Sequence, residues 1–189
     1  MPELIDISKK ILLLGDPSVG KTSLVRKFVY DMFDDNYIST LGTKVTKKSI
    51  VYENLLPDTK LQLTLLIWDV MGQKDYERFQ QRAYTGSQGA LLVCDLTRSE
   101  TLQSLPEWVT NLFNVTSQIP ITIIANKNDL SDQKQFDLKD IEEYASTFEV
   151  PSFLTSAKTG ENINEVFKLL AQNMIKADSN VMPELIKEK

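Results

Sequence analysis

Residues 15–22 read Gly-Asp-Pro-Ser-Val-Gly-Lys-Thr and match the spacing G-x-x-x-x-G-K-[ST] of a phosphate-binding loop. An apolar run at 10–14 precedes the stretch, and an apolar helical pattern of Leu24, Val25 and Phe28 follows it. The sequence therefore predicts a buried strand, a glycine-rich turn and a helix in this order. Such a turn lets several backbone N–H groups point at phosphate oxygens, and the helix N-terminus adds its dipole.

Two side chains of this stretch carry further chemistry. Lys21 supplies a positive charge to the β- and γ-phosphates of a nucleotide, and Thr22 supplies a hydroxyl to Mg²⁺. The alternative is a chance glycine-rich turn before a helix. The strand before the stretch and the helix after it favour the phosphate-binding loop.

Short apolar runs and helical patterns alternate along the rest of the chain. Residues 89–94 and 119–125 read as further buried strands, as a parallel sheet covered on both faces requires. Two longer segments of mixed polarity, 45–52 and 61–68, flank a turn-rich connector at 53–59 and predict an antiparallel hairpin at the sheet edge. This alternation predicts an α/β domain with a mostly parallel sheet.

Three amphipathic helices are predicted where apolar residues recur about every 3.6 positions. Their apolar faces are Leu105, Trp108, Val109 and Leu112; Leu138, Ile141, Ala145 and Phe148; and Ile163, Val166, Phe167 and Leu170. We interpret all three faces as core packing.

The composition excludes several classes of function. The chain has 189 residues, which suits one domain, and 21 Lys and Arg against 26 Asp and Glu give a net charge of −5. This charge argues against a protein that binds nucleic acid through bulk charge. With no histidine and only Cys94, the chain has no His-based triad, no Cys/His zinc site and no internal disulfide. A cytoplasmic protein without a membrane span or a signal peptide is expected.

A polar tetrapeptide, Asn-Lys-Asn-Asp at 126–129, follows the predicted strand 119–125. The carboxylate of Asp129 can accept both donors of guanine, N1–H and the 2-amino group, which adenine lacks. Lys127 can lay its aliphatic stem over the base, and Asn126 can tie neighbouring loops together. A polar loop after a strand is the alternative, which the phosphate-binding loop upstream disfavours.

Three more segments are candidates for the functional site because of where they lie in the chain. In Trp-Asp-Val-Met-Gly-Gln at 68–73, Asp69 can hold Mg²⁺, Gly72 can reach a γ-phosphate through its N–H, and Gln73 can orient the attacking water. Thr40 lies between the first helix and the hairpin. At 155–160, Thr-Ser-Ala-Lys-Thr-Gly, small residues allow a backbone N–H to meet the guanine O6.

In order and spacing, these five segments resemble those of the Ras superfamily of small GTPases over roughly residues 8–176. The Rab-like subgroup is most similar, through 37–42, 68–69 and 89–97. The resemblance implies the G domain of the P-loop NTPase fold, a six-stranded, mostly parallel sheet with one antiparallel edge hairpin and helices on both faces. We expect this domain at 1–178, followed by a short tail.

The resemblance also implies the site residues, with GTP or GDP as the ligand and Mg²⁺ as the cofactor. The nucleotide-binding residues would be Gly15, Ser18, Val19, Gly20, Lys21, Thr22, Ser23, Phe33, Tyr37, Thr40, Gly72, Asn126, Lys127, Asp129, Ser156, Ala157 and Lys158. The metal ligands would be Thr22, Thr40 and Asp69, the last through a water molecule. The catalytic residues would be Gln73, Lys21 and Thr40.

A cytoplasmic monomer is expected, contacting effectors, exchange factors and activators through residues about 34–46 and 70–84. The chain departs from the family at Pro17, which fixes φ and lacks an N–H near the γ-phosphate. It also ends, over the tail 179–189, without a cysteine for lipidation. Either a lipidated tail was removed, or the protein has no lipid anchor, as in a prokaryotic or archaeal relative.

Three functions compete. The first is a molecular switch that cycles between GTP and GDP through slow, Mg²⁺-dependent hydrolysis. The second is a small P-loop kinase, for which no insertion long enough for a lid is present. The third is a nucleotide-locked scaffold with negligible turnover, for which Pro17 is the only signal.

Overall fold

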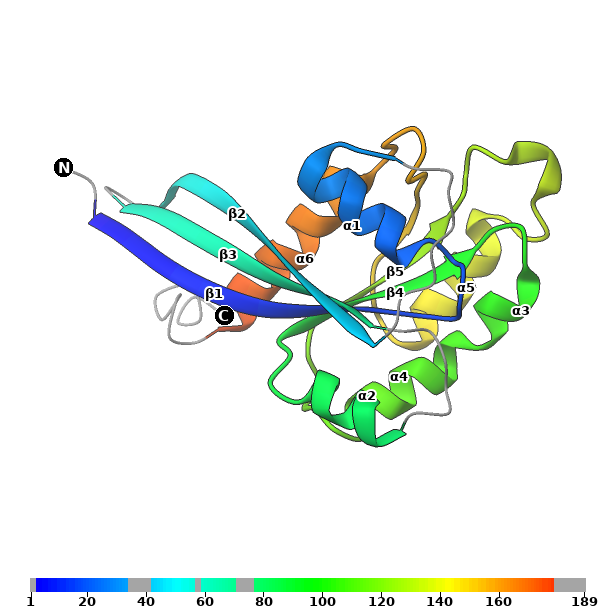
Figure 1. Cartoon of the computed structure of the whole chain (residues 1–189), viewed down its shortest axis with the longest axis horizontal. Helices are drawn as coiled ribbons and strands as arrows, with labels where there is room; N and C mark the ends of the chain where they lie inside the picture. The colour runs from blue at the N-terminus through cyan, green and yellow to red at the C-terminus, as the bar shows by residue number, and fades with distance from the viewer. Residues whose placement is uncertain (1–2, 34–41, 57–58, 71–76, 179–189) are drawn as a thin grey trace.

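The structure is a computed structural model that describes residues 3–33, 42–56, 59–70 and 77–178 (Figure 1). The strands are β1 Glu3–Leu14, β2 Thr43–Leu56, β3 Thr59–Val70, β4 Gly89–Asp95, β5 Ile121–Asn126 and β6 Ser152–Leu154. The helices are α1 Lys21–Tyr30, α2 Glu77–Tyr84, α3 Ser99–Gln103, α4 Leu105–Phe113, a 3₁₀-helix Ser131–Gln133, α5 Leu138–Thr147 and α6 Ile163–Ala177.

The strands form one sheet in the order β2-β3-β1-β4-β5-β6. Among the described strands, β2 and β3 pair antiparallel and the other neighbours run parallel. The predicted fold class, a mostly parallel sheet with one antiparallel edge hairpin, is confirmed.

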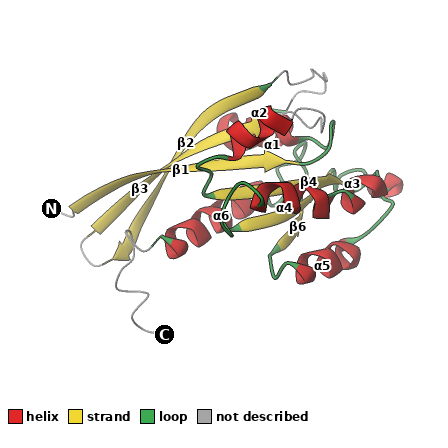
Figure 2. Ribbon diagram, turned by 90° about the horizontal axis from the view of Figure 1, so that it is seen from below, coloured by secondary structure: helices red, strands yellow, loops and turns green. Residues whose placement is uncertain are grey.

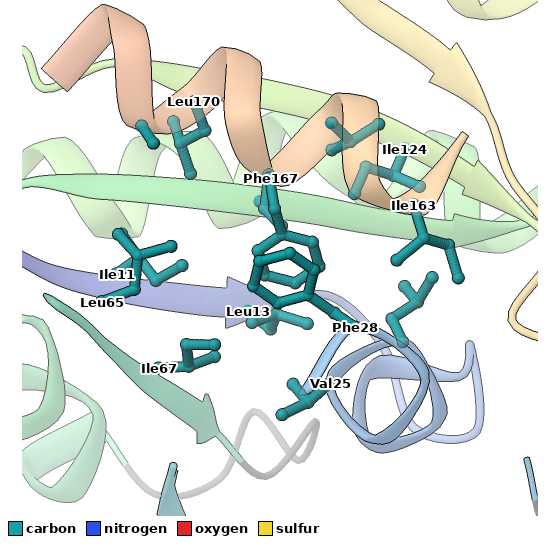
Figure 3. Close-up of a cluster of buried hydrophobic side chains, with 14 of the residues drawn as sticks. Ile11, Leu13, Val25, Phe28, Leu65, Ile67, Ile124, Ile163, Phe167 and Leu170 are labelled. Carbon is teal, nitrogen blue, oxygen red and sulfur yellow. The ribbon is translucent and has the colours of Figure 1, made fainter. Parts of the chain in front are cut away.

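Helices cover both faces of the sheet. Successive residues of a central strand point to opposite faces, and both sets of residues are apolar, so each face is covered by helices. Ile11 and Leu13 of β1 pack with α1 and α6, whereas Leu12 and Leu14 pack with α2 to α5. On the first face the rings of Phe28 and Phe167 stack with centroids 3.9 Å apart (Figure 3). Aromatic pairs of this kind stabilise the core beyond the area that they bury.

The predicted faces of the helices at 105–113 and 163–177 are buried throughout. The prediction for α5 is wrong at one residue, since Leu138 is 39% exposed. Leu138 is the first residue of α5, directly after the N-cap Asp137, and its side chain belongs to neither core cluster.

Several strands are longer or shorter than predicted, most of all β1 and the hairpin strands. β1 begins at Glu3 rather than at Lys10, because it pairs with β3 along eleven residues. The hairpin strands also run into the predicted connector 53–59, with a register shift between Glu53 and Leu56. β5 begins at Ile121 rather than at 119, directly after Pro120, since proline has no N–H to donate to a neighbouring strand. β6 likewise begins directly after a proline, Pro151.

The N-terminal part of β1 and the β2–β3 hairpin extend beyond the helices in both views of the whole molecule (Figure 2). At the opposite end, the carboxyl ends of the parallel strands converge. No helix within the described ranges is long and apolar enough to cross a bilayer.

Candidate functional site

Five parallel strands end at one edge of the sheet, and the predicted segments follow these ends. Ligands bind at this edge in open α/β sheets, because the loops there converge. The strand ends concerned are Leu14, Val70, Asp95, Asn126 and Leu154. The fold therefore brings together 15–22, 126–129 and 155–160, which are far apart in sequence.

The loop 15–22 makes a tight turn at the N-terminus of α1. Gly15 has φ of 136°, and a Cβ on it would lie 2.1 Å from the carbonyl oxygen of Val93. Gly20 has φ of 100° and is the N-cap of α1, so the first N–H groups of the helix face the loop. Ser18 has a left-handed φ of 64°. This alternation of backbone conformations forms the kind of N–H concavity that binds anions.

Lys21 is buried inside the curve of this loop. Its Nζ donates to the carbonyl oxygens of Gly15, at 2.7 Å, and Asp16, at 2.9 Å. Burial lowers the pKa of Lys21 to about 8, against the opposing charges of Asp69 and Asp16. A desolvated ammonium at this position favours an anionic ligand, because a phosphate would restore the preference for the charged form.

Thr22 and Asp69 form a pair of oxygen ligands at the start of α1 and the end of β3. The Thr22 hydroxyl donates to Oδ2 of Asp69. Asp69 is only 2% exposed, and burial raises the pKa of its carboxyl. Oδ1 of Asp69 is buried and accepts no hydrogen bond in the described part of the chain.

This pair fits Mg²⁺, which takes one or two protein oxygens and completes its shell with water and substrate phosphates. Within the described ranges, no cluster of three or more His, Cys, Asp or Glu side chains could hold a metal by itself. A cation bound beside Asp69 would satisfy its Oδ1, which has no hydrogen-bond partner in the described part of the chain.

Asn126 links three loops. Its Nδ2 donates to the carbonyl oxygen of Val19 at 3.0 Å, and its Oδ1 accepts from the Ala157 N–H at 3.1 Å and the Thr155 hydroxyl at 3.3 Å. Its side chain is buried. The phosphate-binding loop is therefore held to the loops at 126–129 and 155–160 by one side chain, as predicted for Asn126.

Asp129 and Ser156 face each other across the two neighbouring loops. The Ser156 hydroxyl donates to Oδ1 of Asp129 at 2.6 Å and accepts from the Thr159 N–H at 3.1 Å. The backbone N–H of Asn128 donates to the carbonyl oxygen of Thr155 at 2.9 Å. These bonds fix a half-buried carboxylate at the edge of the site.

Sequence reasoning missed Asp95, a fully buried carboxylate at the end of β4. Its Oδ2 lies 2.6 Å from Nζ of Lys127 and 3.1 Å from Nε of Arg98. Burial acts to raise the pKa of Asp95, but hydrogen bonds from Lys127 and Thr97 outweigh it, so the pKa lies below its usual value. The position of Asp95 directly after the predicted buried strand 89–94 was the available signal.

Three further hydrogen bonds tie the phosphate-binding loop to the segment after β4. The Asp16 carboxylate accepts from the Ser104 hydroxyl at 2.8 Å and from Nε1 of Trp108 at 2.9 Å. The carbonyl oxygen of Pro17 accepts from Nη2 of Arg98 at 2.8 Å. No sequence pattern indicates these contacts, because they join residues more than 80 positions apart.

The remaining predicted site residues are placed as follows. Val19 is buried, Ser23 is half-buried, Lys158 is exposed, and Phe33 is 36% exposed just after α1. Tyr37, Thr40, Gly72 and Gln73 lie outside the described residues.

The amino-acid sequence of the chain is similar to those of known proteins. A family model described as the Ras family matches residues 10–176. The Ras-related protein Rab-22A of Canis lupus familiaris is 37% identical over 172 residues, 90% of this chain and 86% of that protein. The GTP-binding protein ypt5 of Schizosaccharomyces pombe is 35% identical, covering 90% and 80%. The Ras-related protein Rab-31 of Homo sapiens is 36% identical, covering 87% and 82%.

Proposed function

Because the chain belongs to the Ras family, as a Rab-like member of the superfamily of small GTPases, we propose that it is a switch driven by slow GTP hydrolysis. Members of this family are GTPases and bind GTP or GDP. The observation that carries the proposal is the Asn126 side chain, which holds the phosphate-binding loop beside the loop of Asp129. Residues 1–178 are the proposed G domain and 179–189 the tail.

Guanine is the base that this site fits. The Asp129 carboxylate, fixed by Ser156, is proposed to accept N1–H and the 2-amino group. The N–H of Ala157 is held near Asn126, in the loop proposed to meet the guanine O6. Adenine would leave the carboxylate without its two donors, which disfavours ATP.

Lys21 and the N–H groups at the start of α1 are proposed to bind and orient the β- and γ-phosphates. The oxygen of a water molecule then bonds to the γ-phosphorus, while the bond between the γ-phosphorus and the bridging oxygen breaks. The electron pair stays on GDP, and the water proton leaves with inorganic phosphate. Thr22 and Asp69 would hold Mg²⁺, which when bound neutralises charge on the phosphates. Thr40 as a further ligand and Gln73 as the residue that orients the water remain proposals on residues outside the described ranges.

The output of the switch is proposed to be recognition by effectors, exchange factors and activators through residues 34–46 and 70–84. Binding of GTP rather than GDP changes the contacts available to such loops. The names of the relatives, Ras-related and GTP-binding proteins, support a role in trafficking or signalling. The buried Cys94 and the acidic charge support a cytoplasmic protein that does not bind nucleic acid.

The purified protein is expected to carry GDP and to hydrolyse GTP, but not ATP, over hours in the presence of Mg²⁺. Extraction of the bound nucleotide and chromatography of both turnover reactions check this. Bound GTP without turnover would instead favour the scaffold. Bound adenine nucleotide, or equal use of ATP, would overturn the proposal.

Thr22→Asn is expected to lower Mg²⁺-dependent affinity for GTP by about tenfold or more, with GDP less affected, because a ligand of the ion is lost. Titration of a fluorescent GTP analogue with and without Mg²⁺ measures the effect. Thr22→Ser keeps the hydroxyl and is the matched control. Equal GTP affinity of Thr22→Asn and the unchanged protein would contradict the assignment of Thr22 as a ligand.

A further inference from the structure

A second positive charge lies beside the phosphate-binding loop and has no part in the function proposed above. It is the guanidinium of Arg98, the residue just before α3. Its Nη2 donates to the carbonyl oxygen of Pro17 at 2.8 Å, and its Nε lies 3.1 Å from Oδ2 of Asp95. Both anchors fix the plane of the guanidinium at the rim of the loop.

The charge of Arg98 is not cancelled by its partner. Asp95 is shared between Arg98 and Lys127, so that two cations surround one buried carboxylate. Among the described residues, Glu100 is the further acid paired with Arg98; its Oε1 lies 4.0 Å from Nη1, too far for a hydrogen bond, and its side chain is well exposed. The single Asp95 carboxylate therefore cannot neutralise both the guanidinium and the Lys127 ammonium. The charge of Arg98 also reaches Lys21, where, besides burial, it lowers the pKa.

The guanidinium retains N–H groups for a ligand. In the described part of the chain, the hydrogen bonds of the Arg98 guanidinium are those to the Asp95 carboxylate and the Pro17 carbonyl oxygen, and the side chain is 35% exposed. A guanidinium has more N–H groups than these two bonds use. It also recognises phosphate oxygens well, because its planar donors match their geometry.

Pro17 explains why such a donor is useful at this position. Proline has no N–H, so residue 17 cannot contribute a backbone donor to the cradle. The Arg98 guanidinium is hydrogen-bonded to the carbonyl of this same residue. The side chain thus supplies N–H groups and charge where the backbone supplies none.

We propose that Arg98 is a further catalytic residue for GTP hydrolysis, whose guanidinium donates to a phosphate oxygen of the nucleotide from within the same chain. This inference rests on the proposed GTPase function. Charge that develops on the phosphates as the γ-phosphorus bond breaks would be stabilised by an arginine that needs no activator protein.

The test compares the unchanged protein with Arg98→Ala, Arg98→Lys and, as a control for loss of a neighbouring charge, Glu100→Ala. Single-turnover hydrolysis of bound GTP with Mg²⁺ is measured, together with GDP affinity and the binding of aluminium fluoride to the GDP form, which imitates the transferring phosphoryl group. Arg98→Ala is expected to slow hydrolysis by about tenfold or more, to abolish aluminium fluoride binding and to change GDP affinity by less than about threefold. Glu100→Ala is expected to match the unchanged protein.

A role of Arg98 in loop structure alone predicts the opposite split, with weaker GDP binding and an unchanged rate of hydrolysis. That result, or hydrolysis by Arg98→Ala within about twofold of the unchanged protein, overturns the proposal. If Arg98→Ala does not fold, Arg98→Lys decides, because it keeps the charge but loses the fork and is expected to show the same tenfold loss. Failure of the unchanged protein to hydrolyse GTP would instead count against the proposed function.

Discussion

Asp129→Asn is expected to reduce the affinity for GTP by about a hundredfold or more and to raise the affinity for xanthosine triphosphate. The carboxylate of Asp129 is held at the edge of the site by the 2.6 Å bond from Ser156. An asparagine amide would turn an N–H donor toward the 2-amino donor of guanine, which loses a charged hydrogen bond and leaves a polar group unpaired. Xanthine has a carbonyl at that position, and an amide pairs with it. Each tenfold in affinity corresponds to about 1.4 kcal/mol.

Competition of GTP and xanthosine triphosphate against a fluorescent guanine nucleotide measures this exchange of specificity. Asp132→Asn is a matched control, because Asp132 is an exposed carboxylate three residues further along the chain. We expect it to leave both affinities unchanged. Unaltered GTP affinity in Asp129→Asn would show that Asp129 does not contact the base.

Gly20→Ala is expected to destabilise the fold by about 3 kcal/mol and to abolish tight nucleotide binding. Gly20 has φ of 100°, and an added Cβ would lie 2.3 Å from Nδ2 of Asn126. Asn126 would have to leave the Val19 carbonyl, to which it donates at 3.0 Å. Backbone strain of about 1–3 kcal/mol then adds to the loss of a buried hydrogen bond, about 1–3 kcal/mol.

Gly86→Ala separates these two contributions. Gly86 also has a left-handed φ, 72°, but a Cβ there would meet no atom within 4 Å. Its substitution should cost only about 1–2 kcal/mol and leave nucleotide affinity unchanged. Urea unfolding and the dissociation rate of a fluorescent nucleotide distinguish the variants. Equal losses of stability in both would mean that the contact with Asn126 contributes nothing.

Much of the fold was predictable because the central strands are continuously apolar. The run 10–14 and the segments 89–94 and 119–125 have this pattern and form β1, β4 and β5. The full length of β1 was missed, because Glu3 to Lys9 lack the continuous apolar run of the central strands. The only signal there was a short alternation in which Ile5 and Ile7 face the core and Asp6 and Ser8 do not.

The functional site was also predictable only in part. Asn126 was expected to tie loops, and its contacts with Val19 and Ala157 confirm this. The bonds of Asp16 to Ser104 and Trp108 could not be predicted, since they depend on how α4 packs beside the loop. The motif predicts the conformation of the loop backbone. The side chains that contact this loop come from other helices, whose position depends on the tertiary fold.

The contact between Trp108 and Asp16 has an optical consequence. The chain has two tryptophans, and Trp108 donates its indole N–H to Asp16 while Trp68 directly precedes Asp69. The Trp68 ring also lies under the Lys10 ammonium, at 3.8 Å from its centroid. The indole of Trp108 therefore contacts the phosphate-binding loop directly, through Asp16. The ultraviolet emission of the unlabelled protein is a built-in reporter of what this edge of the sheet binds.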